Sequence, residues 1–305
     1  MANMNNISIS FQPMTVREIL RRSFRIYKSN YIRFIGTILL IKGSYLILGY
    51  IIKEIIVFIV KGPNPDTLAP ETMIYVDYLI DLGIKAFELF FITPFLVGIL
   101  TISISSMLLN KKAGIVDVYS RLSKKILPLI GTVFITGVMM AVVFFMSASL
   151  GLSMIFAGSQ PGLLVVIAGM FMTGVLLVWY AFISQAVIFE GEGGIGAMKR
   201  SKYLVKGSFA RTFLLVIVSL IAITFAAELA SLGVYQLFSL FGSYGITLAG
   251  GASEGVSNII SVIVEPLRII IIIILYYDFR IRKEGYDPEI MAQEFKGITE
   301  KESEV

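Results

Sequence analysis

Two charged side chains, Glu265 and Arg268, lie inside an apolar run that extends from about 259 to 277. The two are three residues apart, so they share one face of a helix. Charged groups are costly inside a membrane, and those that occur generally face protein or water rather than lipid. The pair therefore allows two interpretations. It could form a charged site for an ion, a proton or an anionic substrate group, or it could be a buried ion pair that holds spans together, with Pro266 loosening the helix.

Three further ionisable residues extend this candidate substrate or ion site: Lys42 in the first apolar run, Glu88 in the second and Glu228 in the fifth. If all five residues converge, they form a polar centre within the membrane; if they are scattered, they act as fasteners between helices. Helix breaks expected at Pro94 and Pro266 could free carbonyl groups for coordination or could simply kink the helices.

Other common forms of chemistry are excluded by composition. The chain contains no cysteine and no histidine, so it can build neither a thiolate metal site nor an imidazole base. No soluble segment exceeds about 30 residues, which leaves no room for a nucleotide-binding or hydrolase domain. A Gly-x-Gly-Gly-x-Gly run at 191–196 follows no strand and begins with acidic residues, so it is a poor phosphate loop. We therefore expect no catalytic residues, no metal, no cofactor and no enzymatic activity.

The elements that must position the charged residues are membrane spans. The chain is 56% hydrophobic and only 15% charged, which is too apolar for an ordinary soluble domain of 305 residues. The pattern predicts an all-α polytopic membrane protein with a cytoplasmic segment (1–30), a membrane domain (31–280) and a charged tail (281–305). Six transmembrane helices are expected at about 34–58, 84–109, 126–156, 163–189, 212–238 and 256–279. A Gly- and Ser-rich loop over 242–255 should precede the last one.

The distribution of positive charge predicts the orientation. Of the 26 Lys and Arg residues, 21 lie in four segments, namely 1–33, 110–125, 189–211 and 280–305. An excess of Lys and Arg marks the cytoplasmic side, so both termini should be cytoplasmic, in the plasma (inner) membrane of a prokaryote. The same distribution explains the net charge of +5 without nucleic acid as a partner. The first 30 residues lack the pattern of a cleavable signal peptide, so the first span should remain and serve for insertion.

Basic amphipathic stretches precede the first, third and fifth spans. The first begins at a capping box, Thr15 to Glu18, with Met14 and Ile19 placed for a hydrophobic staple. Such helices should lie on the cytoplasmic headgroups, where each Lys or Arg near the surface contributes about 1 kcal/mol of attraction to anionic lipid; the alternative is a solvated helix packed on the protein. The recurrence suggests three copies of a surface helix plus a hairpin. The predicted lipid or partner face comprises Arg17, Arg21, Arg25, Lys28, Lys199 and Arg200.

Three stretches together resemble bacterial membrane proteins related to the membrane domain of glycerophosphoryl diester phosphodiesterases. They are residues 15–30, beginning Thr-Val-Arg-Glu-Ile-Leu-Arg-Arg-Ser-Phe; residues 189–207, beginning Phe-Glu-Gly-Glu-Gly-Gly-Ile-Gly; and residues 275–287, beginning Leu-Tyr-Tyr-Asp-Phe-Arg-Ile-Arg. In such phosphodiesterases, catalysis belongs to a separate soluble barrel with histidine and metal-binding carboxylates. This chain has neither, so the resemblance implies a stand-alone membrane module without the activity.

The sequence supports two hypotheses for function. In the first, the protein is a non-enzymatic membrane subunit or scaffold that binds a lipid or amphiphile, or docks a soluble or membrane protein partner at its cytoplasmic face. In the second, it is a small transporter or channel whose path runs past Glu265, Arg268 and Glu88. Nothing in the residue pattern sets the oligomeric state.

Overall fold

The computed structural model describes residues 13–61, 70–108 and 115–285, and over these residues the chain is helical, with no strand. Six helical segments are long and apolar enough to cross a membrane: Val16–Val60, Thr72–Leu108, Ile126–Phe156, Gly162–Glu190, Phe209–Ser239 and Gly255–Glu284. This confirms the predicted fold class, and the third segment has the predicted bounds. Most of the predicted tail, 281–305, lies outside the described residues.

The spans are interrupted in places, so each is built from several elements. The first consists of α1 (Val16–Ile38), a π-helical turn η1 (Leu39–Gly43) and α2 (Ser44–Lys61). The second joins α3 (Pro70–Phe87), η3 (Glu88–Ile92) and α4 (Thr93–Leu108). The remaining elements are α5 (Ile115–Ser123), α6 (Ile126–Phe156), α7 (Gly162–Trp179), α8 (Ile183–Gln185), η4 (Ala186–Glu190), α9 (Ile195–Val205), α10 (Phe209–Ser239) and α11 (Gly242–Glu284).

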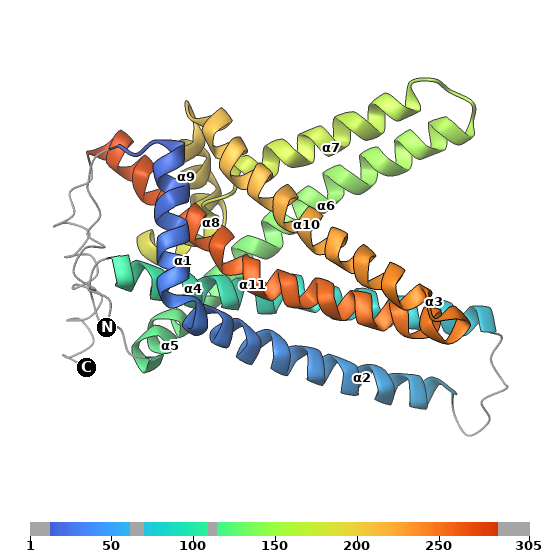
Figure 1. Cartoon of the computed structure of the whole chain (residues 1–305). Coiled ribbons are helices and arrows are strands. Elements are labelled where there is room, and N and C mark those ends of the chain that lie inside the picture. Colours follow the sequence, from blue (N-terminus) through green and yellow to red (C-terminus); the bar gives the residue numbers. More distant parts are fainter. Residues whose placement is uncertain (1–12, 62–69, 109–114, 286–305) are drawn as a thin grey trace.

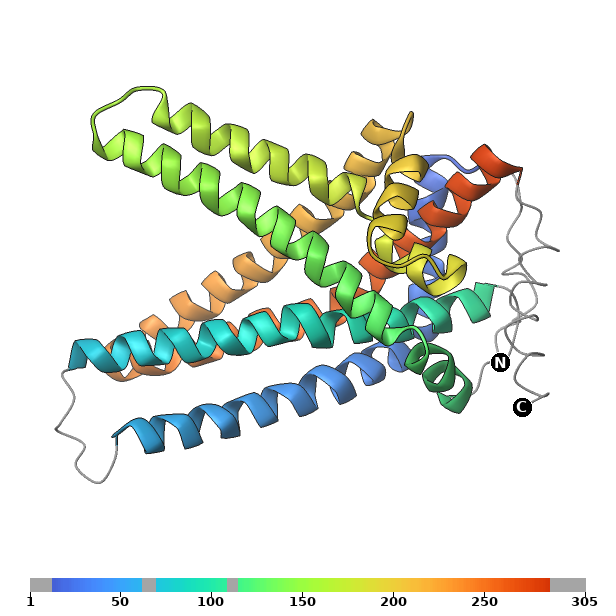
Figure 2. The ribbon, with the colours of Figure 1, turned by 180° about the vertical axis from the view of Figure 1, so that it is seen from behind.

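The helices radiate from one end of the molecule, which we call the hub. The hub gathers α5, α8, α9, the first half of α1, α4 and the last turns of α11 (Figure 1). Two arms leave it: the α6–α7 hairpin forms one, and α2, α3, α10 and most of α11 form the other. The arms diverge with distance from the hub in both views (Figure 2). Most large buried side chains lie in the hub, whereas the arms expose many large apolar residues, as expected of surfaces that face hydrocarbon.

Helix α1 begins and bends where its sequence predicts. Thr15 accepts a hydrogen bond from the backbone N–H of Glu18, and the Glu18 carboxylate accepts one from the Thr15 N–H at 2.6 Å, which confirms the capping box. Asn30 has non-helical dihedral angles, φ −133° and ψ 16°. At this kink the chain turns, so that the first half of α1 runs across the direction of α2 (Figure 1).

The predicted loop over 242–255 is wrong, because α11 already begins at Gly242 and continues without interruption to Glu284. Glycine weakens a helix by only about 1 kcal/mol per residue, and packing along α10 outweighs that cost here. The basic stretches before the third and fifth spans are helical, as α5 and α9. Gly207, with φ +81°, follows the end of α9 in the left-handed conformation that commonly ends a helix.

Candidate functional site: an intramembrane charge cluster and the hub network

Four of the five intramembrane candidates meet at one place, the charge cluster, formed by Lys42, Glu88, Glu265 and Arg268. The Lys42 ammonium Nζ lies 2.8 Å from Glu265 Oε2 and 3.3 Å from Glu88 Oε1. Arg268 Nη2 lies 3.7 Å from Glu265 Oε1. The side chains of Lys42 and Glu265 are 16% and 10% exposed, and those of Glu88 and Arg268 are each 29% exposed. A buried ion pair is therefore flanked by two partly exposed charges of opposite sign.

The cluster lies within the apolar stretches of three spans. Lys42 is about 18 Å along its helix from the kink at Asn30, and Glu265 is about 20 Å along α11 from Asp278, since a helix rises about 1.5 Å per residue. The hydrogen bond from Tyr27 to Ile263, two residues before Glu265, brings the first half of α1 close to the cluster.

Two of the three spans that contribute to the cluster are π-helical there, and the third carries a proline. Lys42 lies in η1, and Glu88 opens η3, which ends just before Pro94. Glu265 directly precedes Pro266 within α11. Proline removes a backbone donor, and π-helical turns shift the hydrogen-bond pattern by one residue, so both leave carbonyl groups with altered partners. The break predicted near Pro94 therefore coincides with η3, whereas the break predicted at Pro266 is not present, because α11 continues through it as an α-helix.

Two tyrosines complete the hydrogen bonding at these irregular turns. The Tyr45 hydroxyl donates to the carbonyl of Ile84, four residues before Glu88. The Tyr27 hydroxyl donates to the carbonyl of Ile263 at 2.7 Å, three residues before Pro266. Each tyrosine lies on the first span and reaches another one, so the irregular turns are braced from a neighbouring helix.

Glu228 does not belong to the cluster. Its side chain is exposed on α10, and it makes no hydrogen bond or ion pair within the described part of the chain. The hypothesis that all five residues form one centre is therefore correct for four of them.

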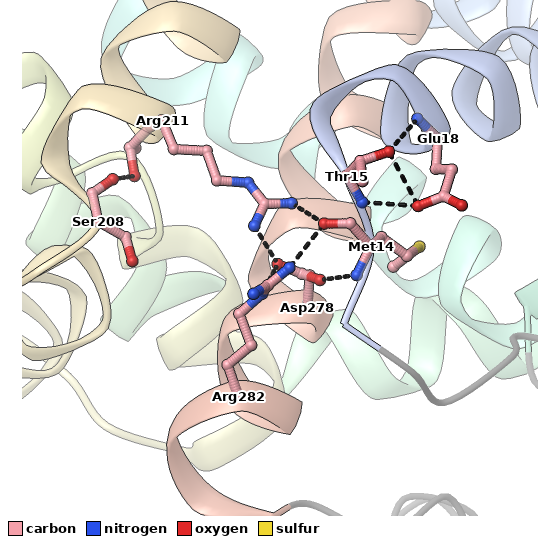
Figure 3. A network of polar contacts seen from close by, with 8 residues as sticks. Met14, Thr15, Glu18, Ser208, Arg211, Asp278 and Arg282 are labelled. Atoms are coloured by element: carbon pink, nitrogen blue, oxygen red, sulfur yellow. Dashed lines mark hydrogen bonds and ion pairs between the residues drawn. The ribbon is translucent and has the colours of Figure 1, made fainter.

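A second group of charges, buried in the hub, fastens the start of α1 (Figure 3). Asp278 is fully buried and accepts from the backbone N–H of Met14 at 2.7 Å, from Arg282 Nε at 2.8 Å, and lies 3.2 Å from Arg211 Nη1. Both arginines also donate to the Met14 carbonyl, Arg282 at 2.7 Å. Both polar groups of the Met14 backbone are thus bound by side chains from α10 and α11.

A second set of contacts holds α9 and η4 to α11. Glu190 accepts from the Tyr276 hydroxyl at 2.6 Å and from Arg200, which also pairs with Glu284. Burial disfavours the charged form of Arg200, but its hydrogen bonds with Glu284 and Glu190 raise its pKa above the ordinary value. Arg280 donates to Glu284 at 3.1 Å. Arg200, expected on the lipid or partner face, is therefore engaged within the hub.

The other five residues of the predicted lipid or partner face are exposed: Arg17, Arg21, Arg25, Lys28 and Lys199. On α1 the exposed residues form two adjacent stripes. Arg17, Arg21 and Arg25 follow one another at four-residue spacing, and Leu20 and Phe24, 45% and 57% exposed, form an apolar stripe beside them. The remaining face, with buried Ile19, Ser23 and Ile26, packs toward α11.

Sequence reasoning missed the hub network and the two bracing tyrosines. It did not single out Asp278, which is fully buried. A usable signal was present: Asp278 and Arg282, and also Arg280 and Glu284, are four residues apart and so form pairs along one helix. The adjacent Tyr276 and Tyr277 are packing residues, 0% and 2% exposed.

No family model, no curated protein and no solved structure matches this chain. The interpretation of the site therefore rests on its own geometry.

Proposed function

We propose that this protein binds an amphiphilic molecule within the membrane, at the charge cluster, and carries out no catalysis of its own. The observation that carries the proposal is the convergence of Lys42, Glu88, Glu265 and Arg268 from three spans, two of which are π-helical there. Side chains from positions far apart in the sequence meet there, in a region otherwise built from apolar residues.

Partial exposure supports binding over a purely structural role. A fastener between helices gains most when its charges are fully enclosed, because charge exposed to hydrocarbon is costly. Glu88 and Arg268 are each 29% exposed at this depth, so each needs a polar partner beyond the residues that touch it. Departures from regular α-helix of this kind occur often at functional sites. A polar headgroup with an apolar tail would satisfy both the charges and the surrounding apolar surface.

The test is native mass spectrometry of the mildly solubilised protein, with the wild type beside the Glu265→Gln/Arg268→Ala variant. We expect a lipid or other amphiphile retained by the wild type and lost by the variant. Glu228→Gln is the matched control, because it removes an intramembrane charge outside the cluster and should leave retention unchanged. A wild type that carries nothing, or a variant that keeps its lipid while folded, would contradict the proposal.

Transport is the second candidate, and the observation in its favour is that two of the three contributing spans are π-helical at the cluster and the third carries Pro266. Such turns line substrate paths in transporters. If the protein transports its ligand, Arg268→Ala should abolish flux in proteoliposomes while the protein stays folded. If the protein binds the amphiphile but shows no flux, it has a binding role and is not a transporter.

A further role belongs to the first half of α1, before the kink at Asn30, which we propose lies on the cytoplasmic leaflet. Its apolar stripe at Leu20 and Phe24 beside the stripe of arginines suits the boundary between acyl chains and anionic headgroups. The same face could dock a partner instead. The resemblance to the membrane domain of glycerophosphoryl diester phosphodiesterases agrees with a lipid-associated role.

A further inference from the structure

We infer that the amphiphile carries a zwitterionic headgroup, with its anionic group at Arg268 and its ammonium group at Glu88. The inference rests on the proposed binding function and specifies its ligand. It follows from the way in which the four charges share their contacts.

The centre of the cluster is held by ion pairs, although Glu265 Oε2 makes no well-aligned hydrogen bond within the described residues. Lys42 contacts both carboxylates, Glu265 at 2.8 Å and Glu88 at 3.3 Å, and together with Glu265 it is the most buried part of the site. A ligand that displaced this pair would break its two closest contacts. The groups left for a ligand are the partly exposed ones on either side of it.

Arg268 is the cation that remains available. Its single polar contact within the described part of the chain is with Glu265, and that distance of 3.7 Å exceeds hydrogen-bond length. Glu265 is in turn held more closely by Lys42. A guanidinium group offers five N–H donors in a planar fork that suits a phosphate or carboxylate. Arg268 therefore has the capacity to bind an anionic group without breaking an existing hydrogen bond.

The turn that carries Glu88 also carries exposed aromatic rings. Phe87 and Phe91 of the same span stack on each other at 4.8 Å, and their side chains are 49% and 43% exposed. The Tyr45 ring stacks on Phe87 at 6.1 Å. Carboxylate and aromatic faces together are the groups that proteins use to bind ammonium and its methylated forms.

The charge balance agrees with a ligand that has no net charge. The cluster contains two cations and two anions, so a zwitterion pairs with both exposed groups and leaves no charge uncompensated in the membrane interior. An anionic headgroup alone would pair with Arg268 but add a net negative charge to a cluster that is neutral, at the cost that an uncompensated buried charge carries.

The experiment is a competition for the delipidated protein between two lipids with the same acyl chains, phosphatidylcholine and phosphatidylglycerol, measured by native mass spectrometry. We expect phosphatidylcholine to be retained about tenfold better, the equivalent of one favourable ionic contact. Glu88→Gln should remove this preference, Arg268→Gln should weaken both lipids, and Glu228→Gln should change neither. If Glu88→Gln does not fold, Phe91→Leu keeps the carboxylate and should still reduce phosphatidylcholine binding.

The outcomes separate this inference from the function on which it rests. Preferential phosphatidylglycerol binding that depends on Arg268 but not on Glu88 or Phe91 would overturn the zwitterionic headgroup and leave amphiphile binding intact. Equal binding of both lipids, insensitive to every substitution in the cluster, would overturn both.

Discussion

At the scale of single residues, the ammonium group of Lys42 is the centre of the charge cluster, because it is the contact shared by Glu88 and Glu265. Removal of one partner from a buried ion pair leaves the other charge without compensation, which costs far more than the pair contributes in net stability. The energetic role of the cluster is therefore best measured by changing both partners.

We expect Lys42→Met to lower the free energy of unfolding by about 3–5 kcal/mol, because it leaves Glu88 without its ion-pair partner and Glu265 with Arg268 alone, 3.7 Å away. The double variant Lys42→Met/Glu265→Leu should be more stable than Lys42→Met, because it removes the poorly compensated Glu265 carboxylate. Thermal unfolding of the purified proteins in one detergent provides the measurement. If the effects of Lys42→Met and Glu265→Leu alone add up to the effect of the double variant, the two side chains do not interact.

At the scale of elements, two kinds of contact position the helices. The α6–α7 hairpin depends on close backbone approach: a Cβ added at Gly151 would lie 2.7 Å from the Gly162 carbonyl oxygen. Small residues allow such approach between membrane helices and are a main source of their association. The α1 helix depends instead on polar contacts, because Asp278 and two arginines bind the Met14 backbone at its start.

Gly151→Ala should lower the free energy of unfolding by about 1–3 kcal/mol, because the backbone of α7 leaves no room for the added methyl group. Gly174→Ala on α7 is the matched control: a Cβ there meets no atom within 4 Å. It should be neutral or stabilising by up to about 1 kcal/mol, the difference in helix propensity. Thermal unfolding compares the two, and equal effects would argue against tight packing within the hairpin.

Asp278→Asn should destabilise the hub, since it leaves Arg211 and Arg282 without their buried carboxylate; the expected loss is about 3–5 kcal/mol. Asp77→Asn tests the same chemical change at a half-exposed position, where Lys53 is 4.0 Å away, and should have little effect. Hydrogen exchange should also become faster over residues 16–29 in Asp278→Asn. Unchanged protection of that segment would show that Asp278 does not hold α1 in place.

At the scale of the whole molecule, the hub and the tip of the α6–α7 hairpin lie at opposite ends (Figure 1). The hub contains the basic helices, which the positive-inside rule assigns to the cytoplasm. A chain without cysteine allows this orientation to be measured with single introduced thiols.

In intact cells, a membrane-impermeant maleimide should label Gln160→Cys, at the hairpin turn, and should not label Lys199→Cys, which is exposed on α9 in the hub. After the membrane is permeabilised, both should react. Labelling of Lys199→Cys in intact cells would show that the orientation is the opposite of the predicted one.

The sequence by itself determined the fold class, six spans and the start of α1. Hydropathy, helix capping and charge bias are properties of short segments, so they predict elements regardless of what those elements touch. The third span, at 126–156, and the capping box at Thr15 were correct for this reason.

Only the tertiary structure decided that Lys42, Glu88, Glu265 and Arg268 meet while Glu228 stands apart, and that Asp278 is buried. Which faces of two helices meet depends on their crossing angle and rotation, and these are set by the side chains of both helices at once. The sequence of one span does not show which helix it packs against. Its charged residues are therefore only candidates for a site, and packing between the spans decides which of them meet.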